Sequence, residues 1–198
     1  MIAFEETKLF LKTAGFSCAE TWSALTEEDL SVLRQNTYSR KFDFTYTLCV
    51  AKRCKFGVPQ VVVCRPYGKD CRPFPTLFWL VCPYLDRVCG KLESEQNITL
   101  LESLFRKNSD AILAFHKKYQ DIRLALIDDN VREKIITTNL AMWKSLKETG
   151  IGGISWKKFP YSAKCLHLQT ATLLGMNEHP AQDLISELIG DFNCPDNY

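Results

Sequence analysis

The sequence predicts an α+β fold, with a small antiparallel sheet in the first half of the chain and a mainly helical second half. Short runs rich in β-branched and aromatic residues, bounded by proline and glycine, lie between residues 42 and 81. From residue 83 onward apolar residues recur at helical spacing. There is no internal repeat, low-complexity linker or clear domain boundary, so we expect a single domain across residues 1–198.

Residues 1–36 have a helical pattern. Thr26 is followed by three acidic residues, which is typical of an N-cap and the first turn of a helix. Leu30 and Leu33 then supply an apolar face. We therefore expect helix to precede the sheet.

Three segments are predicted strands. Residues 42–50 carry aromatic or apolar side chains at every second position, which is the period of a half-buried strand. Residues 58–64 and 77–81 are short β-branched or aromatic runs. The segment 77–81 is apolar enough to predict that it is a central strand.

The second half of the chain predicts a series of helices. Pro83 suits the first turn of a helix, and Gly150 is a plausible residue to end one. The expected helices start at Pro83, after Asn97 and after Ser109, and then cover residues 129–149, 165–174 and 181–189.

Composition and cysteine content predict a cytoplasmic protein. No stretch approaches the roughly 18 consecutive apolar residues of a membrane span. The first residues lack the basic and then apolar regions of a secretion signal. The 9 cysteines are an odd number, and no C-x-x-C pair occurs. We therefore expect reduced thiols rather than a disulfide framework.

The net charge of +2 is unevenly distributed. Residues 38–72 carry 8 basic side chains against 2 acidic ones, and residues 144–164 carry 5 lysines against 1 glutamate. Such windows are usually solvated faces, but if they meet in space they would attract an anionic ligand.

Several uncommon motifs occur in order along the chain. They are R-C-x-x-G-x-P at residues 53–59, P-F-P-T-x-F-W-L-x-C-P at 73–83, Leu92-Glu93, and K-C-L-H at 164–167. On these motifs, residues 50–190 resemble the bacterial domain of unknown function 501 family, whereas residues 1–49 lie outside the resemblance. The family's N-P-x-G element is replaced here by the sequence around His179. The resemblance implies no particular activity.

The motif residues suggest a zinc site. Cys54, Cys82, Cys165 and His167 lie within the motifs and together form a Cys₃His set, a standard tetrahedral zinc environment. Residues two apart on a helix point in nearly opposite directions. The hypothesis therefore requires Cys165 and His167 to lie in a loop, in a strand or at the start of a helix.

A cysteine-dependent enzyme is the first alternative. A thiol at a helix N-terminus beside lysine has a lowered pKa and gains nucleophilicity. Cys82 precedes Pro83 and Cys165 follows Lys164, so both fit that environment. His167, or less plausibly His179, would then be the base.

An anion- or nucleic-acid-binding module is the second alternative. Gly152 and Gly153 would expose backbone N–H groups, while Lys164 and Arg53 would supply charge. Aromatic residues between lysines at residues 156–161 would suit stacking on bases. The segment does not match the phosphate-binding loop of nucleotide hydrolases.

Two other polar groups have structural interpretations. His116 falls on an apolar helical stripe, which predicts a buried histidine with hydrogen-bond partners. Asp128 precedes a predicted helix, which indicates an N-cap rather than a catalytic acid.

Overall fold

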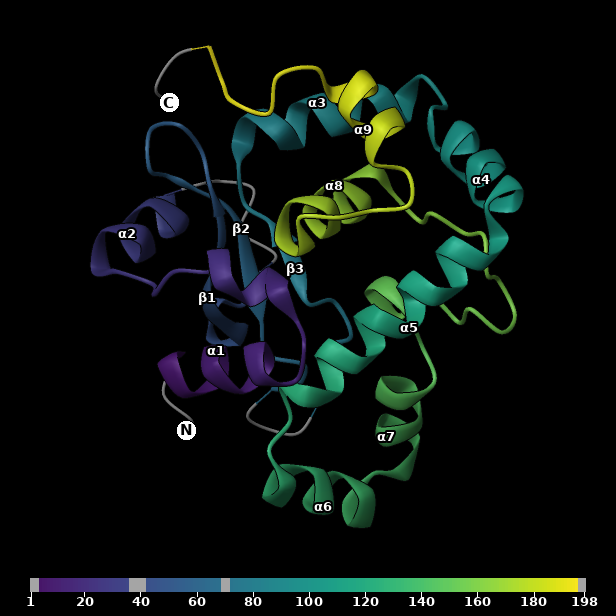
Figure 1. The fold of residues 1–198 in the computed structure, drawn as a ribbon. Coiled ribbons are helices and arrows are strands. Elements are labelled where there is room, and N and C mark those ends of the chain that lie inside the picture. The colour runs from purple at the N-terminus through teal and green to yellow at the C-terminus, as the bar shows by residue number, and fades with distance from the viewer. Residues whose placement is uncertain (1–3, 36–41, 69–71, 196–198) are drawn as a thin grey trace.

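The computed structural model describes residues 4–35, 42–68 and 72–195. A three-stranded antiparallel sheet occupies the first half of the chain, and helices make up the second (Figure 1). The predicted α+β class is confirmed. None of the helices in these described ranges is long and apolar enough to cross a membrane.

The sheet has the order β1-β2-β3, with β1 at Thr47–Arg53, β2 at Pro59–Cys64 and β3 at Phe78–Leu80. All of β2 is buried, as expected for a strand with neighbours on both sides. The prediction of a central strand at residues 77–81 is wrong, because β3 is an edge strand. Its apolar side chains are covered by packing against its two faces rather than by a further strand.

The strand predicted at residues 42–50 starts later than expected. Residues Phe44–Tyr46 form a short 3₁₀ helix, η3, and β1 begins at Thr47. The Asp43 side chain accepts a hydrogen bond of 2.9 Å from the Thr45 N–H. This local bond favours a turn over the extended backbone that the alternating pattern predicts.

The N-terminal segment is helical, as predicted. It contains α1 (Phe4–Thr13), the 3₁₀ helix η1 (Ser17–Thr21) and α2 (Glu27–Gln35). Thr26 Oγ1 accepts from the Asp29 N–H at 3.1 Å, and Asp29 Oδ2 accepts from the Thr26 N–H at 2.9 Å. This reciprocal pair confirms the predicted N-cap of α2.

The helices of the second half lie close to their predicted positions, with one exception. They are α3 (Pro83–Ser94), α4 (Ile98–Lys107), α5 (Ser109–Ala125), α6 (Asp129–Thr138), α7 (Leu140–Lys147), α8 (Leu166–Met176) and α9 (Gln182–Ile189), with the 3₁₀ helix η4 (Ile151–Gly153) before α8.

The exception is the single helix predicted at residues 129–149. The structure divides it at Asn139, whose backbone leaves the helical conformation and whose side chain accepts from the Met142 N–H at 3.0 Å. Asn139 thus caps α7, so α6 and α7 are separate helices. The predicted cap at Asp128 is confirmed, because its side chain accepts from the Val131 N–H.

Gly150 does not end a helix, since α7 already ends at Lys147. It is required for a close approach, because a Cβ at this position would lie 2.2 Å from His116 Nδ1. His116 is fully buried, its Nδ1 accepts from the Ile151 N–H, and its Nε2 faces the Pro160 carbonyl. The prediction of a buried, hydrogen-bonded histidine is confirmed.

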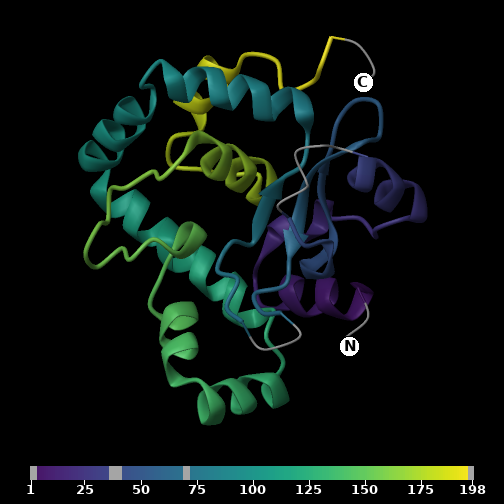
Figure 2. The ribbon, with the colours of Figure 1, turned by 180° about the vertical axis from the view of Figure 1, so that it is seen from behind.

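Helix α8 packs on one face of the sheet and contacts all three strands. Figures 1 and 2 show it between the sheet and the pair α3 and α9, while α6 and α7 lie at the opposite end of the molecule. The other sheet face carries a second cluster that includes Phe42, Val62, Phe74 and Trp79. The start of α8 therefore lies beside the edge strand β3.

Candidate functional site

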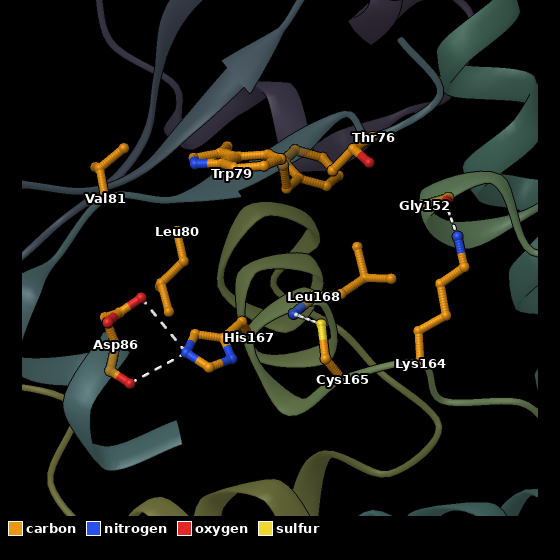
Figure 3. A pocket seen from close by; sticks show the side chains of 11 residues that line it. Thr76, Trp79, Leu80, Val81, Asp86, Gly152, Lys164, Cys165, His167 and Leu168 are labelled. Carbon is orange, nitrogen blue, oxygen red and sulfur yellow. Dashed lines mark hydrogen bonds and ion pairs between the residues drawn. The ribbon is translucent and has the colours of Figure 1, made fainter. Parts of the chain in front are cut away.

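A pocket of about 370 Å³ lies between β3 and the first turn of α8 (Figure 3). Most of its lining side chains are apolar, and the charged ones come from α3 and from the residues around the start of α8. Its lining residues are Thr76, Phe78, Trp79, Leu80, Val81, Asp86, Gly152, Lys164, Cys165, His167 and Leu168. Segments that are far apart in the sequence thus meet at one surface.

Cys165 is the N-cap residue of α8. Its Sγ accepts a hydrogen bond from the Leu168 N–H at 3.4 Å. Because Cys165 itself has an extended backbone, its side chain and that of His167 are not forced to opposite sides of a helix. The condition that the zinc hypothesis placed on these two residues is met.

His167 is the only residue of α8 that is not buried, and it lines the pocket. Its Nδ1 lies 2.8 Å from Glu93 Oε1, and its Nε2 lies 3.1 Å from the Asp86 carbonyl oxygen and 3.4 Å from Asp86 Oδ1. Hydrogen bonding with Cys165, and then with Glu93, raises the pKa of His167 to about 9 against the opposing effect of burial. Both ring nitrogens thus face oxygen atoms, an arrangement that favours the imidazolium form.

Glu93 links α3 to the start of α8. Its Oε1 accepts from the Leu166 N–H at 2.5 Å and from the His167 N–H at 3.2 Å, besides facing His167 Nδ1. The ligand atoms of Glu93, Cys165 and His167 all lie within 4.8 Å of one another. These three residues form the Glu93–Cys165–His167 cluster, an arrangement that can hold a metal ion.

Of the four predicted zinc ligands, the structure brings Cys165 and His167 together. Cys54 and Cys82 are not part of this cluster, for which Glu93 supplies the third group. Cys82 is the N-cap residue of α3 and is 9% exposed, and Cys54 follows the end of β1. Burial raises the pKa of Cys82, and the neighbouring thiols of Cys194 and Cys54 raise it further.

Of the four predicted anion-binding residues, the structure brings Gly152, Gly153 and Lys164 together. Lys164 Nζ donates to the Gly152 carbonyl at 2.6 Å across one end of the pocket (Figure 3). Arg53 has other partners, since it forms an ion pair with Asp29 at 2.7 Å. The Gly153 N–H donates to the Gly150 carbonyl, so it is not directed at a ligand.

The cysteines in the described part of the chain are free thiols, as predicted. Most are buried, and burial raises the pKa of Cys49 and Cys89 to about 12 and that of Cys18 to about 11. Such thiols stay protonated at neutral pH and act as packing groups. Cys71 lies outside the described residues.

Glu93 and Asp86 are the functional candidates that sequence reasoning missed. Both lie on α3, seven residues apart, with Cys89 between them. Residues at this spacing share one helix face. The available signal was that Glu93 lies in the Leu92-Glu93 motif and shares a helix face with Asp86, but their partner His167 is more than 70 residues away in the chain.

The fold and the site define an α+β protein with a glutamate–cysteine–histidine cluster whose cysteine and histidine line a pocket. The family model described as "Protein of unknown function (DUF501)" matches residues 50–187, so the chain belongs to the DUF501 family. No curated protein and no solved structure matches the chain. The pocket unites motif residues that carry the family resemblance, including Thr76, Trp79, Lys164 and Cys165.

Proposed function

We propose that this protein binds one divalent metal ion, zinc in preference to others, through Glu93, Cys165 and His167. The observation that carries the proposal is the convergence of three ligand atoms within 4.8 Å of one another, with Cys165 and His167 in the lining of the pocket. Thiolate and imidazole are ligands that suit zinc, and a carboxylate is a common third ligand. Three protein ligands beside a pocket leave a fourth position for water or substrate, as in catalytic zinc sites.

Each proposed ligand has a second partner that would orient it. Cys165 Sγ accepts from the Leu168 N–H, and Glu93 Oε1 accepts from the N–H groups of Leu166 and His167. With a metal ion at Nδ1, His167 would donate its Nε2–H to the Asp86 carbonyl, which lies 3.1 Å away. Ligands in protein metal sites usually have such outer hydrogen bonds.

The same geometry argues against a neutral His167 as general base for Cys165, although it permits an imidazolium beside a Cys165 thiolate, the contact that contributes most to the raised pKa of His167. A base must direct a lone pair at the thiol, but both ring nitrogens face oxygen acceptors at 2.8 and 3.1 Å. A metal ion held by His167 Nδ1 would take the place of the proton on that nitrogen. A bound zinc ion with an open position would supply Lewis-acid chemistry at the pocket.

Metal analysis of protein purified without a metal-affinity tag tests the proposal. We expect about one equivalent of zinc per chain, and Cys165→Ser and Glu93→Gln should each lower metal affinity by at least about 10-fold. Glu93→Gln keeps a carbonyl oxygen that can accept from the Leu166 N–H, so it tests the ligand rather than the helix cap.

Cys54→Ser and Cys82→Ser are the matched controls, because they remove cysteines outside the cluster. Full metal content in both controls supports the Glu93–Cys165–His167 cluster. Loss of metal in both would instead support the Cys54, Cys82, Cys165 and His167 set. Less than about a tenth of an equivalent after loading with zinc would refute metal binding altogether.

Cysteine-dependent chemistry at Cys165 is the second candidate. It is favoured by the position of the thiol at the start of a buried helix, where the Leu168 N–H faces the sulfur. Iodoacetamide labelling of metal-free protein at pH 6 should then modify Cys165 before the other thiols. Protection of Cys165 by added zinc supports the metal proposal, whereas equal labelling with and without zinc favours the enzyme.

A further inference from the structure

The outer edge of β3 carries the backbone N–H and C=O groups of Phe78 and Leu80. The Cys64 N–H donates to the Leu77 carbonyl at 2.6 Å, and the Val81 N–H donates to the Gln60 carbonyl at 2.9 Å. Hydrogen-bonded positions alternate along an antiparallel pair, so Trp79 faces β2, whereas the N–H and C=O groups of Phe78 and Leu80 point away from it. Within the residues that the structure describes, these outward groups form no hydrogen bond.

This open edge borders the pocket. Phe78, Trp79, Leu80 and Val81 all contribute to its lining. Phe78 is almost fully buried, whereas Leu80 is half-buried and offers the more accessible N–H and C=O pair. An unpaired strand edge is a template for a further strand, and proteins often use it to bind extended peptides.

The two ends of the pocket differ in charge, because Asp86 and the His167 ring pair with each other at 3.4 Å at one end, whereas Lys164 lies at the other. Figure 3 shows Asp86 and His167 near Leu80 at one end, and Lys164 near Thr76 at the other. Lys164 Nζ donates to a carbonyl oxygen, and no carboxylate in the described ranges pairs with it. Its ammonium group is therefore available to a carboxylate ligand.

The backbone at Lys164 supports a functional role for this side chain. Its φ of 60° lies in the left-handed region, which a residue with a Cβ adopts at an energetic cost. A lysine held in this conformation, with its side chain reaching across a pocket, is typical of strain retained at a binding site.

We propose that the pocket binds a short apolar peptide by its free C-terminus, as a fourth strand antiparallel to β3. The peptide carboxylate lies at Lys164, its central residue exchanges hydrogen bonds with Leu80, and its side chains contact Trp79 and Leu168. An extended tripeptide spans about 10 Å, which matches the length of the three-residue strand β3. This inference goes beyond metal binding, because none of these contacts uses a metal ion.

Calorimetric titration with trileucine, performed on metal-free and zinc-loaded protein, tests the proposal. We expect binding with a Kd of about 1 mM or tighter. Trileucine amide, which lacks the terminal charge, should bind at least about 10-fold more weakly, because hydrogen bonds to charged groups contribute more than neutral ones. Trileucine methylated on its central amide nitrogen should bind about fivefold more weakly, because it cannot donate to the Leu80 carbonyl.

Octanoate distinguishes a peptide site from a site for any apolar carboxylate. Binding of octanoate as tight as that of trileucine, or no effect of the amide methylation, would overturn the peptide assignment. Absence of trileucine binding in both metal states would overturn it as well. Metal content measured on the same samples keeps this outcome separate from a failure of the metal proposal.

Variants test the protein side of the same contacts. Lys164→Met keeps the aliphatic stem and removes the ammonium, so it should weaken trileucine binding about 10-fold and leave metal content unchanged. Leu80→Pro removes the leucine side chain and an N–H that points away from β2, and proline is tolerated at such positions on edge strands. Leu80→Ala is its matched control, and Leu80→Pro should bind trileucine about fivefold more weakly than Leu80→Ala at equal metal content. Equal affinities for the two Leu80 variants would exclude the edge hydrogen bond.

Discussion

At the scale of single residues, Arg123 shows how a buried charge is accommodated without a carboxylate. It is fully buried, and its guanidinium donates to the carbonyl oxygens of Pro75, Leu146, Thr149 and Gly150. Burial lowers its pKa to about 10, so it remains charged at neutral pH. These bonds fix the segment between α7 and η4, which leads to the pocket.

Arg123→Met should destabilise the protein by at least about 3 kcal/mol, because it leaves several buried carbonyl groups without donors. Urea unfolding followed by circular dichroism measures the loss. Arg132→Met is the control, because Arg132 is exposed and forms a surface ion pair with Asp129. Its effect should stay below about 0.5 kcal/mol. A similar loss in both variants would contradict the role assigned to Arg123.

At the scale of elements, hydrophobic periodicity predicted most helices and strands but not their interruptions. The breaks depend on single side-chain hydrogen bonds, at Asp43 before β1 and at Asn139 between α6 and α7. Hydrophobic periodicity is averaged over a window of many residues, so it does not detect a break that depends on one side-chain hydrogen bond. The position of β3 at the sheet edge was not predictable from its composition either, because packing on both faces buries an edge strand as well as a central one.

Asn139→Ala should destabilise the protein by about 1 kcal/mol, because it removes the side-chain cap of α7. Asn108→Ala is the matched control, since Asn108 is also an N-cap residue but forms no side-chain cap bond. Thermal unfolding of both variants gives the comparison. Equal effects would show that the break at Asn139 does not depend on its side chain.

At the scale of the whole molecule, the candidate site forms where distant segments meet the start of α8. The helix start at Cys165 and His167 was predicted correctly, but the two residues were paired with Cys54 and Cys82 because these four form a Cys₃His set, whereas Glu93, which also lies in a motif, is not part of such a set. Glu93 joins them only through the packing of α3 against α8. Side-chain contacts across more than 70 residues are set by tertiary structure, and no local pattern encodes them.

The buried histidines give the whole fold a pH dependence. Burial lowers the pKa of His116 to about 4 and that of His179 to about 3, from 6.5. Below pH 6.5 the unfolded chain therefore binds protons that the folded protein does not, and stability present above pH 6.5 is lost as the pH falls. Each histidine contributes a slope of up to about 1.4 kcal/mol per pH unit.

Urea unfolding between pH 6.5 and pH 5 measures this slope above the range in which most carboxylates titrate. His179→Gln should reduce the pH slope of the unfolding free energy by up to about 1.4 kcal/mol per pH unit, which corresponds to one bound proton. This change in slope is expected whatever the variant does to the absolute stability. His179 lies at 2.9 Å from Gln169 Oε1 and accepts from the Ala181 N–H, so it is held neutral inside the core. An unchanged slope in the variant would show that His179 is not the group that titrates.

The left-handed backbone conformation at Lys164 has a cost in stability that a glycine would not have. Glycine has the lowest energy at a φ of 60°, so Lys164→Gly should be about 1 kcal/mol more stable than Lys164→Ala, although both variants lose the same ammonium group. Chemical unfolding of the pair isolates this backbone effect. A difference near zero would mean that the backbone relaxes when the side chain is removed. Glycine would make the protein more stable at this position, so the lysine lowers stability while it holds a charged group at the pocket. Such a loss of stability in favour of function is common at ligand-binding sites.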